Sequence, residues 1–351
     1  MNFFNIRHAV FADEEKIINF IKTDWKADHI FVKDQDFFRY QYEDVGSLNF
    51  FIAEHGITRE IIGILGYINY SENCKSSDIF LALWKVRSHL EDPFLGVKLL
   101  DYLIKDLDPQ RLHCVGINKK TTGIYKYMGY LTGAMDHYFY LNKKTKTFKI
   151  AYFPEESTNE FISESLDVFS SDYTLDLLDG QEDLKQAYEK LNVINMIPSK
   201  SFGYLRKRYL LHPIYKYQIF ALKEKWSDKC VAIVFLREVV QNQTKVLRMI
   251  DFVGSIDKIT YLLNKITNYV DENSYEYMDF YCAGIDKELL KTTPLKNLKD
   301  FKNVVIPNYF EPFVQQNIDI FYFTNCKENF YFFKGDGDQD RPNIPRGKNE
   351  C

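Results

Sequence analysis

The chain has 351 residues, of which 46% are hydrophobic and 16% aromatic, which is enough apolar material for one large domain or two smaller ones and too much for a disordered chain. Its formal net charge of −4 at pH 7 argues against a nucleic-acid-binding protein, because such proteins normally carry an excess of Lys and Arg. The six cysteines are far apart and form no CxxC pair, which argues against a zinc site and favours a reducing compartment.

The N-terminal sequence predicts neither export nor membrane insertion. MNFFNIRHAVFADEEK lacks the basic start and the long apolar run of a signal peptide. No apolar stretch reaches the roughly 18 residues that are needed to span a bilayer. We therefore expect a soluble cytoplasmic protein.

The sequence repeats the same order of predicted elements in its two halves. A helix comes first, a run of strands follows, and an amphipathic helix then connects two further strands. The predicted helices span residues 14–24 and 96–107 in the first half and residues 180–192 and 256–270 in the second. The Gly-Ile pairs that end RLHCVGI and YMDFYCAGI begin at Gly116 and Gly284, 168 positions apart (284 − 116). The alternative to a repeat is chance similarity within one continuous α/β domain.

Strands followed by a strand–helix–strand unit predict a mixed sheet in each half, which places the chain in the α/β class (α+β, mixed sheets). We expect two domains, at residues 1–150 and 151–351, joined by a connector within residues 152–174 that contains PEESTNE. Cys114 and Cys282 lie in apolar strand-like runs, so both are predicted to be buried free thiols.

A candidate anion site follows the strand IFLALWKVR of the first half. The loop SHLEDPFLG leads from this strand into the helix at residues 96–107 and ends at Gly96. A helix N-terminus presents free backbone N–H groups and the positive end of the helix dipole to a phosphate. Gly96 has no side chain to keep a ligand away, although a single glycine at this position is also typical of a packing or turn residue.

The residues after the next strand carry a family resemblance. RLHCVGI is followed by Asn118, then by Tyr125 seven residues later and by Gly129-Tyr130 after it. This N-x6-Y-x3-G-[FY] spacing resembles the last part of the GNAT superfamily of N-acyltransferases. The strand–loop–helix at residues 86–100 is similar to the pyrophosphate loop of that family, and IRHAVFADEEKIINFI is similar to its first strand and helix. The resemblance covers residues 4–142.

The resemblance implies an acyl-CoA, such as acetyl-CoA, as co-substrate and no metal. The loop amides of residues 90–96 would hold the pyrophosphate, the backbone at residues 84–86 would pair with the pantetheine arm, and Tyr125 would protonate the departing thiolate as general acid. The implied cofactor-binding residues are Trp84, Lys85, Val86, Arg87, Leu95, Gly96 and Asn118. The family loop is usually Q/R-x-x-G-x-G/A, whereas this chain reads EDPFLGV, so Arg87 would supply the missing positive charge.

The second half departs further from the family pattern. Its strand VLRMIDFVG runs almost directly into SIDKITYLL, a connection too short to wrap a pyrophosphate, and YMDFYCAGI is not followed by the N-x6-Y spacing. The resemblance therefore implies a second GNAT-like domain with a degenerate cofactor site that shapes the acceptor cleft. A purely stabilising partner domain is the alternative.

Acyl transfer to an amine also needs a group that takes a proton. Asp136 and His137, in GAMDHYFYL, are the candidate bases, because a His with a pKa near neutrality suits that role. A hydrogen-bonded structural His at position 137 is equally compatible with the sequence. The candidate substrate-binding residues on the acceptor side are His29, His212, Arg206 and Arg208, the two arginines being suited to a diphosphate.

The C-terminal segment FKGDGDQDRPN contains three alternating carboxylates. Counted from Asp336, a calcium loop would need Gly at the sixth position and Glu at the twelfth, but these positions hold Arg341 and Lys348. We interpret the segment as a loop that returns to the acceptor cleft. Asp336, Asp338 and Asp340 would then bind an amino group or sugar hydroxyls, and Arg341 a phosphate. A solvated tail is the alternative.

Two motifs, KYMGYLTGAMDHYFYLN and DGDQDRPN, are similar to GNAT-type proteins encoded with bacterial surface-polysaccharide genes. This resemblance implies transfer of an acetyl group from acyl-CoA to the amine of a nucleotide-linked amino sugar, as in O-antigen or lipopolysaccharide biosynthesis. An aminoacyl or peptidyl transferase of the tandem-GNAT kind and a non-catalytic binding module are the alternatives. The net charge disfavours the first, since aminoacyl-tRNA calls for a basic surface. A metal-dependent glycosyltransferase is disfavoured because DGDQD lies near the C-terminus rather than within a nucleotide-binding sheet.

Overall fold

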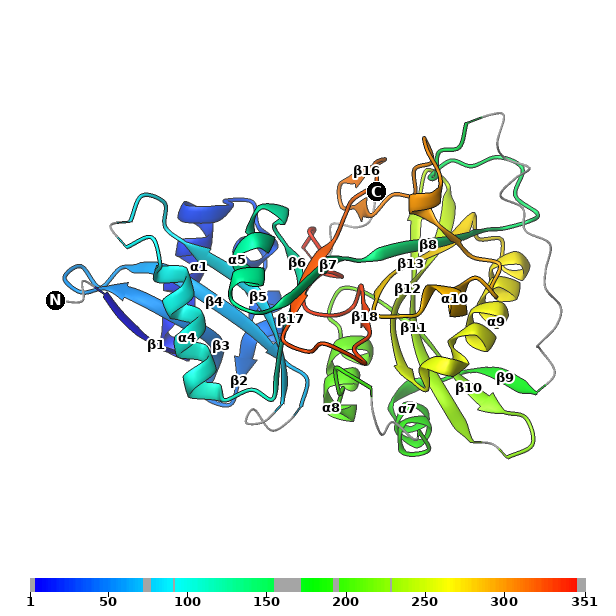
Figure 1. Cartoon of the computed structure of the whole chain (residues 1–351), viewed down its shortest axis with the longest axis horizontal. Helices are drawn as coiled ribbons and strands as arrows, with labels where there is room; N and C mark the ends of the chain where they lie inside the picture. Colours follow the sequence, from blue (N-terminus) through cyan, green and yellow to red (C-terminus); the bar gives the residue numbers. More distant parts are fainter. Residues whose placement is uncertain are drawn as a thin grey trace.

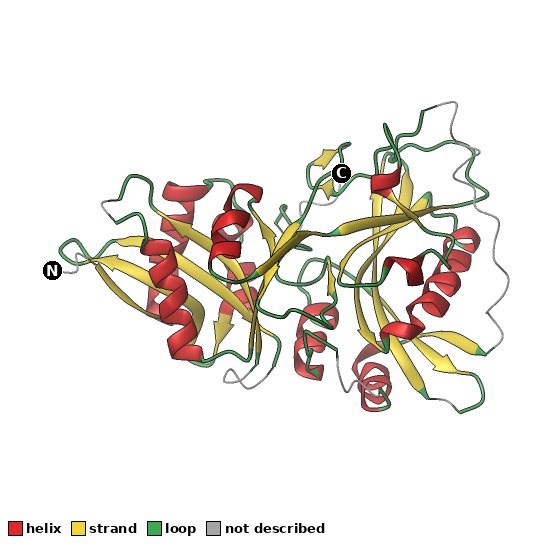
Figure 2. Ribbon diagram, viewed as in Figure 1, coloured by secondary structure: helices red, strands yellow, loops and turns green. Residues whose placement is uncertain are grey.

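The computed structural model describes residues 4–71, 77–90, 92–154, 172–191, 196–227 and 229–345. These residues form two mixed β-sheets that lie side by side along the long axis of the molecule (Figure 1). Helices pack on the faces of both sheets (Figure 2). The α/β class with mixed sheets that the sequence predicts is confirmed.

The first sheet has the strand order β1-β3-β4-β5-β6-β17-β7, with β2 paired to β3. Its strands are β1 (Phe4–Val10), β2 (Glu43–Asp44), β3 (Ser47–His55), β4 (Ile61–Asn69), β5 (Asp78–Val86), β6 (Arg111–Ile117), β7 (Leu131–Ala134) and β17 (Phe321–Thr324). Its helical segments are η1 (Phe11–Asp13), α1 (Glu14–Phe20), η2 (Ile21–Trp25), α2 (Ile30–Lys33), α3 (Gln35–Tyr42), α4 (Leu95–Leu107), η3 (Lys119–Thr121) and α5 (Thr122–Tyr127).

The two faces of the first sheet pack against different helices, because successive side chains of each strand point to opposite faces. Ala53 on β3 and Leu65 on β4 pack with Leu99 and Leu103 of α4. The side chains of opposite orientation, such as Ile52, pack with the helices α1 to α3. This division follows from the two-residue period of a strand and the amphipathic spacing of each helix. It gives the sheet an α4 face and an α1–α3 face.

The second sheet has the order β9-β10-β11-β12-β13-β8-β14, with β18 paired to β13. Its strands are β8 (Asp136–Leu141), β9 (Tyr173–Leu177), β10 (Gln218–Glu224), β11 (Cys230–Gln241), β12 (Thr244–Gly254), β13 (Tyr277–Ala283), β14 (Lys296–Asn297) and β18 (Phe332–Phe333). Its helical segments are α7 (Gly180–Glu189), α8 (Phe202–Leu205), η5 (Arg206–Leu210), η6 (Ile256–Lys258), α9 (Ile259–Glu272), α10 (Lys287–Leu290) and η7 (Leu298–Asp300). A separate hairpin pairs β15 (Tyr309–Phe310) with β16 (Phe313–Val314).

The two sheets repeat one order of elements, as the sequence predicts. Helix α4 lies between β5 and β6, and helix α9 lies between β12 and β13. Gly116 is the second-last residue of β6 and Gly284 directly follows β13, and both have a positive φ, of 93° and 85°. Such a backbone conformation favours glycine. Cys114 and Cys282, which lie two residues before these glycines, are buried free thiols, as predicted.

The two halves exchange a strand. The chain runs from β7 of the first sheet through Met135 into β8, which pairs with β13 and β14 of the second sheet (Figure 1). In return, β17 lies between β6 and β7 in the first sheet. The predicted boundary at residue 150 assigned β8 to the first domain and β17 to the second, whereas each strand pairs in the sheet of the other half. Most of the predicted connector at residues 152–174 lies outside the described residues.

Candidate functional site

The first sheet opens between β5 and β6. These parallel strands pair from Asp78 and Arg111 as far as Leu81 and Cys114. Beyond that point β5 pairs only with β4 among the described strands, and β6 pairs with β17. The gap, here called the β5–β6 opening, leaves one edge of residues 82–86 without a strand neighbour. A free strand edge offers backbone N–H and C=O groups to an extended ligand. The predicted pantetheine-binding residues Trp84, Lys85 and Val86 lie on it, and their role stays a prediction.

The N-terminus of α4 follows the end of β5. The first amides of a helix have no acceptor within the helix. Here the carboxylate of Asp92 accepts the backbone N–H of Phe94 at 2.9 Å and the ammonium of Lys98 at 2.6 Å. A pyrophosphate in this place would compete with Asp92 for the same donors. The residues fit a phosphate through the helix N-terminus and Lys98, with Leu95 and Gly96 in the first turn.

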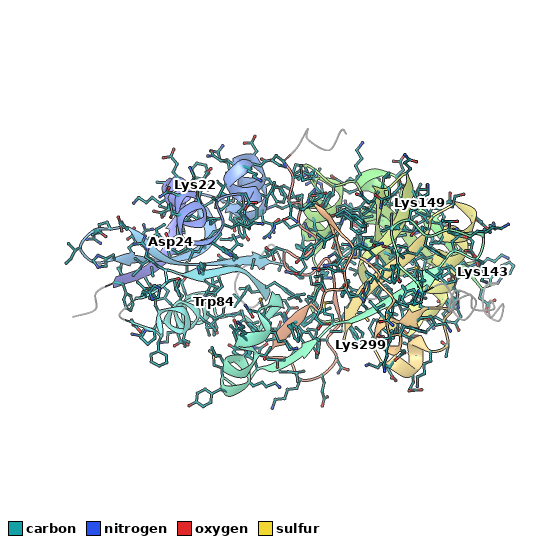
Figure 3. The ribbon with its side chains drawn as sticks, turned by 90° about the horizontal axis from the view of Figure 1, so that it is seen from above. Lys22, Asp24, Trp84, Lys143, Lys149 and Lys299 are labelled. Atoms are coloured by element: carbon teal, nitrogen blue, oxygen red, sulfur yellow. The ribbon has the colours of Figure 1, made fainter. Side chains whose placement is uncertain are left out.

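The structure does not support the predicted role of Arg87 as a phosphate ligand. Its guanidinium donates to Asp24 at 3.0 Å and to Glu60 at 3.1 Å. Asp24 belongs to η2 on the α1–α3 face, whereas Trp84 packs with the cluster of α4, and Figure 3 shows the two side chains on opposite sides of the sheet. The charge of Arg87 is therefore neutralised on the face away from the N-terminus of α4.

Gly96 has room for a methyl group in the protein alone. A Cβ at this position would lie 3.5 Å from Nε1 of Trp84, an ordinary contact. Gly96→Ala should therefore keep or slightly raise the melting temperature, because alanine is the better helix former by up to about 1 kcal/mol. If Gly96 approaches a bound phosphate, the same change should weaken acetyl-CoA binding at least about tenfold in a calorimetric titration, a loss of about 1.4 kcal/mol.

Gly123 in α5 provides the control for this substitution, since no atom beyond its chain neighbours and its own helix backbone lies within 4 Å of the Cβ that alanine would add there. Gly123→Ala should change stability in the same direction and leave acetyl-CoA affinity as it is. Equal affinities of the Gly96→Ala and wild-type proteins would contradict a phosphate at this helix N-terminus.

Tyr125 lies among side chains from three elements around the β5–β6 opening. Its ring centroid is 4.3 Å from that of Phe323 and 5.9 Å from that of Trp84. Burial raises the pKa of the Tyr125 phenol well above its usual range, so the hydroxyl keeps its proton at pH 7. Phe323 comes from the exchanged strand β17, so the second half of the chain helps to position this ring. Asn118 is exposed and accepts the N–H of Lys120 at 2.9 Å, which makes it the N-cap of η3.

A polar cavity of about 400 Å³ lies between the two halves, and the end of β6 reaches it at Gly116. The side chain of Gln339 lies directly against the α-carbon of Gly116. The cavity therefore adjoins the β5–β6 opening. Its charged wall residues are Lys26, Arg237, Lys334, Arg341, Glu311, Asp338 and Asp340. We call this space the central cavity.

The acidic C-terminal loop is not a solvated tail. Asp336 is fully buried and contacts Lys200 at 2.8 Å, and the Tyr70 hydroxyl donates to it at 3.0 Å. Asp340 is 1% exposed and accepts Arg237 at 2.8 Å. The remaining carboxylate of the loop, on Asp338, pairs with Arg341 at 2.6 Å. Each carboxylate thus already has a cationic partner, which argues against the predicted use of Asp336 as an amine ligand.

Asp338, Asp340 and Arg341 line the central cavity, and their predicted contact with a substrate stays a prediction. Burial raises the pKa of Asp340, but the charges of Arg237 and Lys334 outweigh it and hold that pKa at about 2. Asp340 is therefore ionised at pH 7.

The structure places His137 in the core of the second sheet, which argues against its predicted role as the general base. The ring lies on β8, is 5% exposed and stacks on Tyr281 with centroids 3.9 Å apart. Its Nε2 is 2.8 Å from Asp279, and Asp279 also forms a bidentate pair with Arg248. Burial lowers the pKa of His137, although Asp279 opposes this effect. No local feature of the sequence points to Asp279 or Arg248, because both lie more than a hundred residues from His137 along the chain.

Asp136 and Arg206 do not reach the central cavity either. Burial raises the pKa of Asp136, but a hydrogen bond from Lys299 at 2.8 Å and the nearby Lys287 outweigh it, so the net pKa is lowered. A carboxylate held in this way is a weak base. The guanidinium of Arg206 donates to Gln181 at the surface of α7. Neither placement supports the role that the sequence predicted.

Arg208, His29 and His212 stand at the junction of the two halves. Arg208 is buried and donates to the carbonyl of Asp340 at 3.1 Å. Nδ1 of His29 accepts the N–H of Phe31, and Nδ1 of His212 accepts that of Tyr215. Burial, with nearby cations, lowers the pKa of both histidines to about 3, so both are neutral at pH 7. They cap the local backbone, and their predicted contact with the acceptor stays a prediction.

Sequence reasoning missed Arg237, Lys334 and Lys200. Arg237 directly follows the apolar run CVAIVFL within β11, and Lys334 directly precedes GDGDQD. A charged residue within an apolar strand is the one sequence signal that points to the first of these. Across the described ranges, no group of His, Cys, Asp and Glu side chains is arranged to hold a metal ion, and no helix is long and apolar enough to cross a bilayer.

Comparisons with known proteins support the fold. No protein-family model and no curated protein matches the sequence. The structure is similar to that of a GCN5-related N-acetyltransferase from Anabaena variabilis, with a TM-score of 0.54, 10% identity, and coverage of 92% of this chain and 72% of that one. It is also similar to a protein from Enterococcus faecalis V583 described as a probable N-acyltransferase, with a TM-score of 0.53, 9% identity, and coverage of 92% and 71%. The chain therefore has the mixed α/β fold found in the GCN5-related N-acetyltransferases, the fold that its motifs resemble.

Proposed function

We propose that the protein is an acyl-CoA-dependent N-acetyltransferase. The observation that carries the proposal is the β5–β6 opening, which has the N-terminus of α4 at one end and the central cavity beside it. This arrangement suits an extended thioester that lies along β5 and a separate acceptor that enters from the cavity. The names of the two similar structures point to the same reaction class.

In this reaction, different residues of the chain bind the co-substrate and transfer the proton. Bound acyl-CoA supplies a thioester. The free edge of β5 at residues 82–86 orients the pantetheine arm, and the first turn of α4 with Lys98 holds the phosphates. The ring of Phe323 holds Tyr125 in position, and the Tyr125 hydroxyl donates a proton to the departing thiolate.

In the second half, the chain itself occupies the opening that corresponds to the β5–β6 opening. Its strands β12 and β13 pair only from Leu247 to Met249 on β12, so this sheet also opens. The C-terminal segment fills that opening, because β18 pairs with β13 and the N–H of Gly335 donates to the carbonyl of Ile250 at 2.7 Å. The backbone of Gly254 packs against Val231 where a phosphate loop would begin. These contacts support a second GNAT-like half that has a degenerate cofactor site and forms one wall of the acceptor cleft.

The proposed acceptor is the amine of a nucleotide-linked amino sugar used in surface-polysaccharide biosynthesis. A second cavity of about 540 Å³ shares Tyr215, Arg237, Phe310 and Glu311 with the central cavity, so the two offer space for an acceptor larger than one sugar ring. Arg237 lies 4.0 Å from the ring centroid of Tyr215, which gives the shared wall a flat cationic surface. Because acyl-CoA thioesters are cytoplasmic metabolites, we expect the protein to act in the cytoplasm.

A melting-temperature series tests the proposal. Acetyl-CoA at 100 times its dissociation constant should stabilise the protein by about 2.7 kcal/mol through mass action. Thiol release in the presence of UDP- and dTDP-linked amino sugars then identifies the acceptor. A protein that no acyl-CoA stabilises would be the non-catalytic binding module. Stabilisation by acetyl-CoA together with transfer only to an aminoacyl-tRNA or a peptide would replace the sugar acceptor.

A further inference from the structure

Lys334 is a buried lysine with an unusual set of neighbours. It follows β18, is 4% exposed and lines the central cavity. Its ammonium donates to Oδ1 of Asn308 at 2.6 Å and lies 5.7 Å from the ring centroid of Tyr281. Within the described part of the chain no carboxylate forms an ion pair with it. A lysine carries three donors, so at least one remains for a molecule in the cavity.

The charges around Lys334 disfavour its ammonium form. Arg248 on β12 and Arg237 on β11 repel it, whereas Asp340 of the C-terminal loop and Asp279 on β13 attract it. Both carboxylates are already paired with those same arginines. The neutral ring of His137 on β8 completes the surroundings. Burial, with the two arginines, lowers the pKa of Lys334 to about 7.

Lys200 shows that burial alone does not have this effect. It too is buried, but it contacts Asp251 at 2.5 Å and Asp336 at 2.8 Å, and these two carboxylates raise its pKa although burial lowers it. Among the described residues, Lys200 is thus a buried lysine held as an ammonium by two carboxylates, whereas Lys334 is a buried lysine without an ion-pair partner that faces a cavity.

We propose that Lys334 is the general base that accepts a proton from the acceptor amine. This inference rests on the proposed function. The acceptor ammonium in the central cavity transfers one proton to the neutral amine of Lys334. The acceptor nitrogen then attacks the thioester carbonyl, the C–N bond forms, the C–S bond breaks, and the thiolate takes the proton of Tyr125. The second proton of the acceptor nitrogen restores Tyr125, and Lys334 loses its proton to solvent before the next turnover.

Two substitutions distinguish a base from a simple anchor for an anionic group. Arginine keeps the positive charge and the hydrogen-bond donors but does not deprotonate in proteins. Methionine has a similar length and removes the charge. If Lys334 is the base, Lys334→Arg and Lys334→Met should both lose acetyl transfer by about 100-fold or more, the size of a general-base effect. If Lys334 is an anchor, Lys334→Arg should retain most of the activity.

The experiment combines three measurements on the full chain. NMR of protein labelled at the lysine ε-carbon should show the Lys334 signal titrating near pH 7, with Lys200 as the internal reference that stays an ammonium. Acetyl-CoA should raise the melting temperature of the wild-type and both variant proteins alike. Acetyl transfer to the UDP- and dTDP-linked amino sugars should rise with pH through about 7 in the wild-type protein only.

Titration of Lys334 near pH 10, or more than a tenth of wild-type activity in Lys334→Arg, would overturn the assignment. Failure of acetyl-CoA to stabilise the wild-type protein would instead overturn the proposed function, and the role of Lys334 with it. If acetyl-CoA binds but none of these sugars is acetylated, the NMR titration decides for or against a neutral lysine in the cavity.

Discussion

Replacing Tyr125 with phenylalanine should slow acetyl transfer by about 100-fold and leave the fold intact. The change removes only the hydroxyl, and a general acid contributes roughly 10² to 10⁴ to a rate. The remaining ring still packs against Phe323 and Trp84, so the free energy of unfolding should change by no more than about 1 kcal/mol. Because burial keeps Tyr125 protonated, the wild-type rate should not fall through titration of this group between pH 6 and about 9. Steady-state kinetics and thermal unfolding of the two proteins check both parts.

Tyr130 provides the matched control, since its ring contacts the same Phe323 with centroids 4.9 Å apart. Tyr130→Phe should keep the acetyl-transfer rate within about threefold of the wild type. A Tyr125→Phe rate that stays within about threefold of the wild type would remove Tyr125 from the chemistry. An equal large loss in both variants would also contradict the assignment, because it would not distinguish the Tyr125 hydroxyl from that of Tyr130.

Replacing Lys200 with methionine should destabilise the protein by about 3–5 kcal/mol, the cost of leaving buried charges without their partner. Its ammonium lies between the carboxylates of Asp251 and Asp336, both fully buried at the junction of the two halves. The hydroxyl of Tyr209 also donates to Asp251 at 2.7 Å, and it alone does not offset the lost charge. Chemical denaturation at pH 8 measures this difference.

The loss in Lys200→Met should shrink as the pH falls from 8 to 5. Burial raises the pKa of Asp336 to about 6 even though Lys200 opposes this effect, and without Lys200 it should rise further. The folded state of the variant then binds a proton that the unfolded state, with a pKa of about 3.9, does not hold in this range. The favourable contribution of protonated Asp336 is thus present at low pH and lost as the pH rises through its folded pKa. A loss that is independent of pH would contradict this account of the junction.

Lys334→Met is the matched comparison for stability, because it removes a buried lysine that has no carboxylate partner among the described residues. Wherever the unfolded state binds a proton that the folded state does not, stability rises with pH. Lys334 meets this condition between about pH 7, its folded pKa, and about pH 10.4, its unfolded pKa. Lys334→Met should therefore be at least as stable as the wild type at pH 7, in contrast with Lys200→Met.

The elements that the sequence predicts well are those with local signals. The recurrence of leucines at helical spacing predicts a helix at residues 96–107, and helix α4 spans Leu95–Leu107. The order of strands and helices in each half follows in the same way. The exchange of β8 and β17 has no such signal, because HYFYL and FYFT alternate alike and neither sequence specifies which β-strand edge it joins.

The sequence brings residues 84–96 together because they follow one another along the chain, and their role toward acyl-CoA stays a prediction. The partners of the charged groups were not found, since Asp340 meets Arg237 and His137 meets Asp279 only after the chain has folded. The carboxylate of Asp340, which has no evident partner in the sequence, therefore forms a buried ion pair with Arg237. Lys334, which precedes this acidic loop, faces the central cavity.

Hydrogen–deuterium exchange with and without acetyl-CoA tests the central claim most directly. We expect acetyl-CoA to slow exchange in peptides that cover residues 82–100, the free edge of β5 and the first turns of α4. We expect no change in peptides that cover residues 254–263, where the second half begins its corresponding helix. Protection of residues 254–263, or no protection in either region at saturating acetyl-CoA, would contradict it.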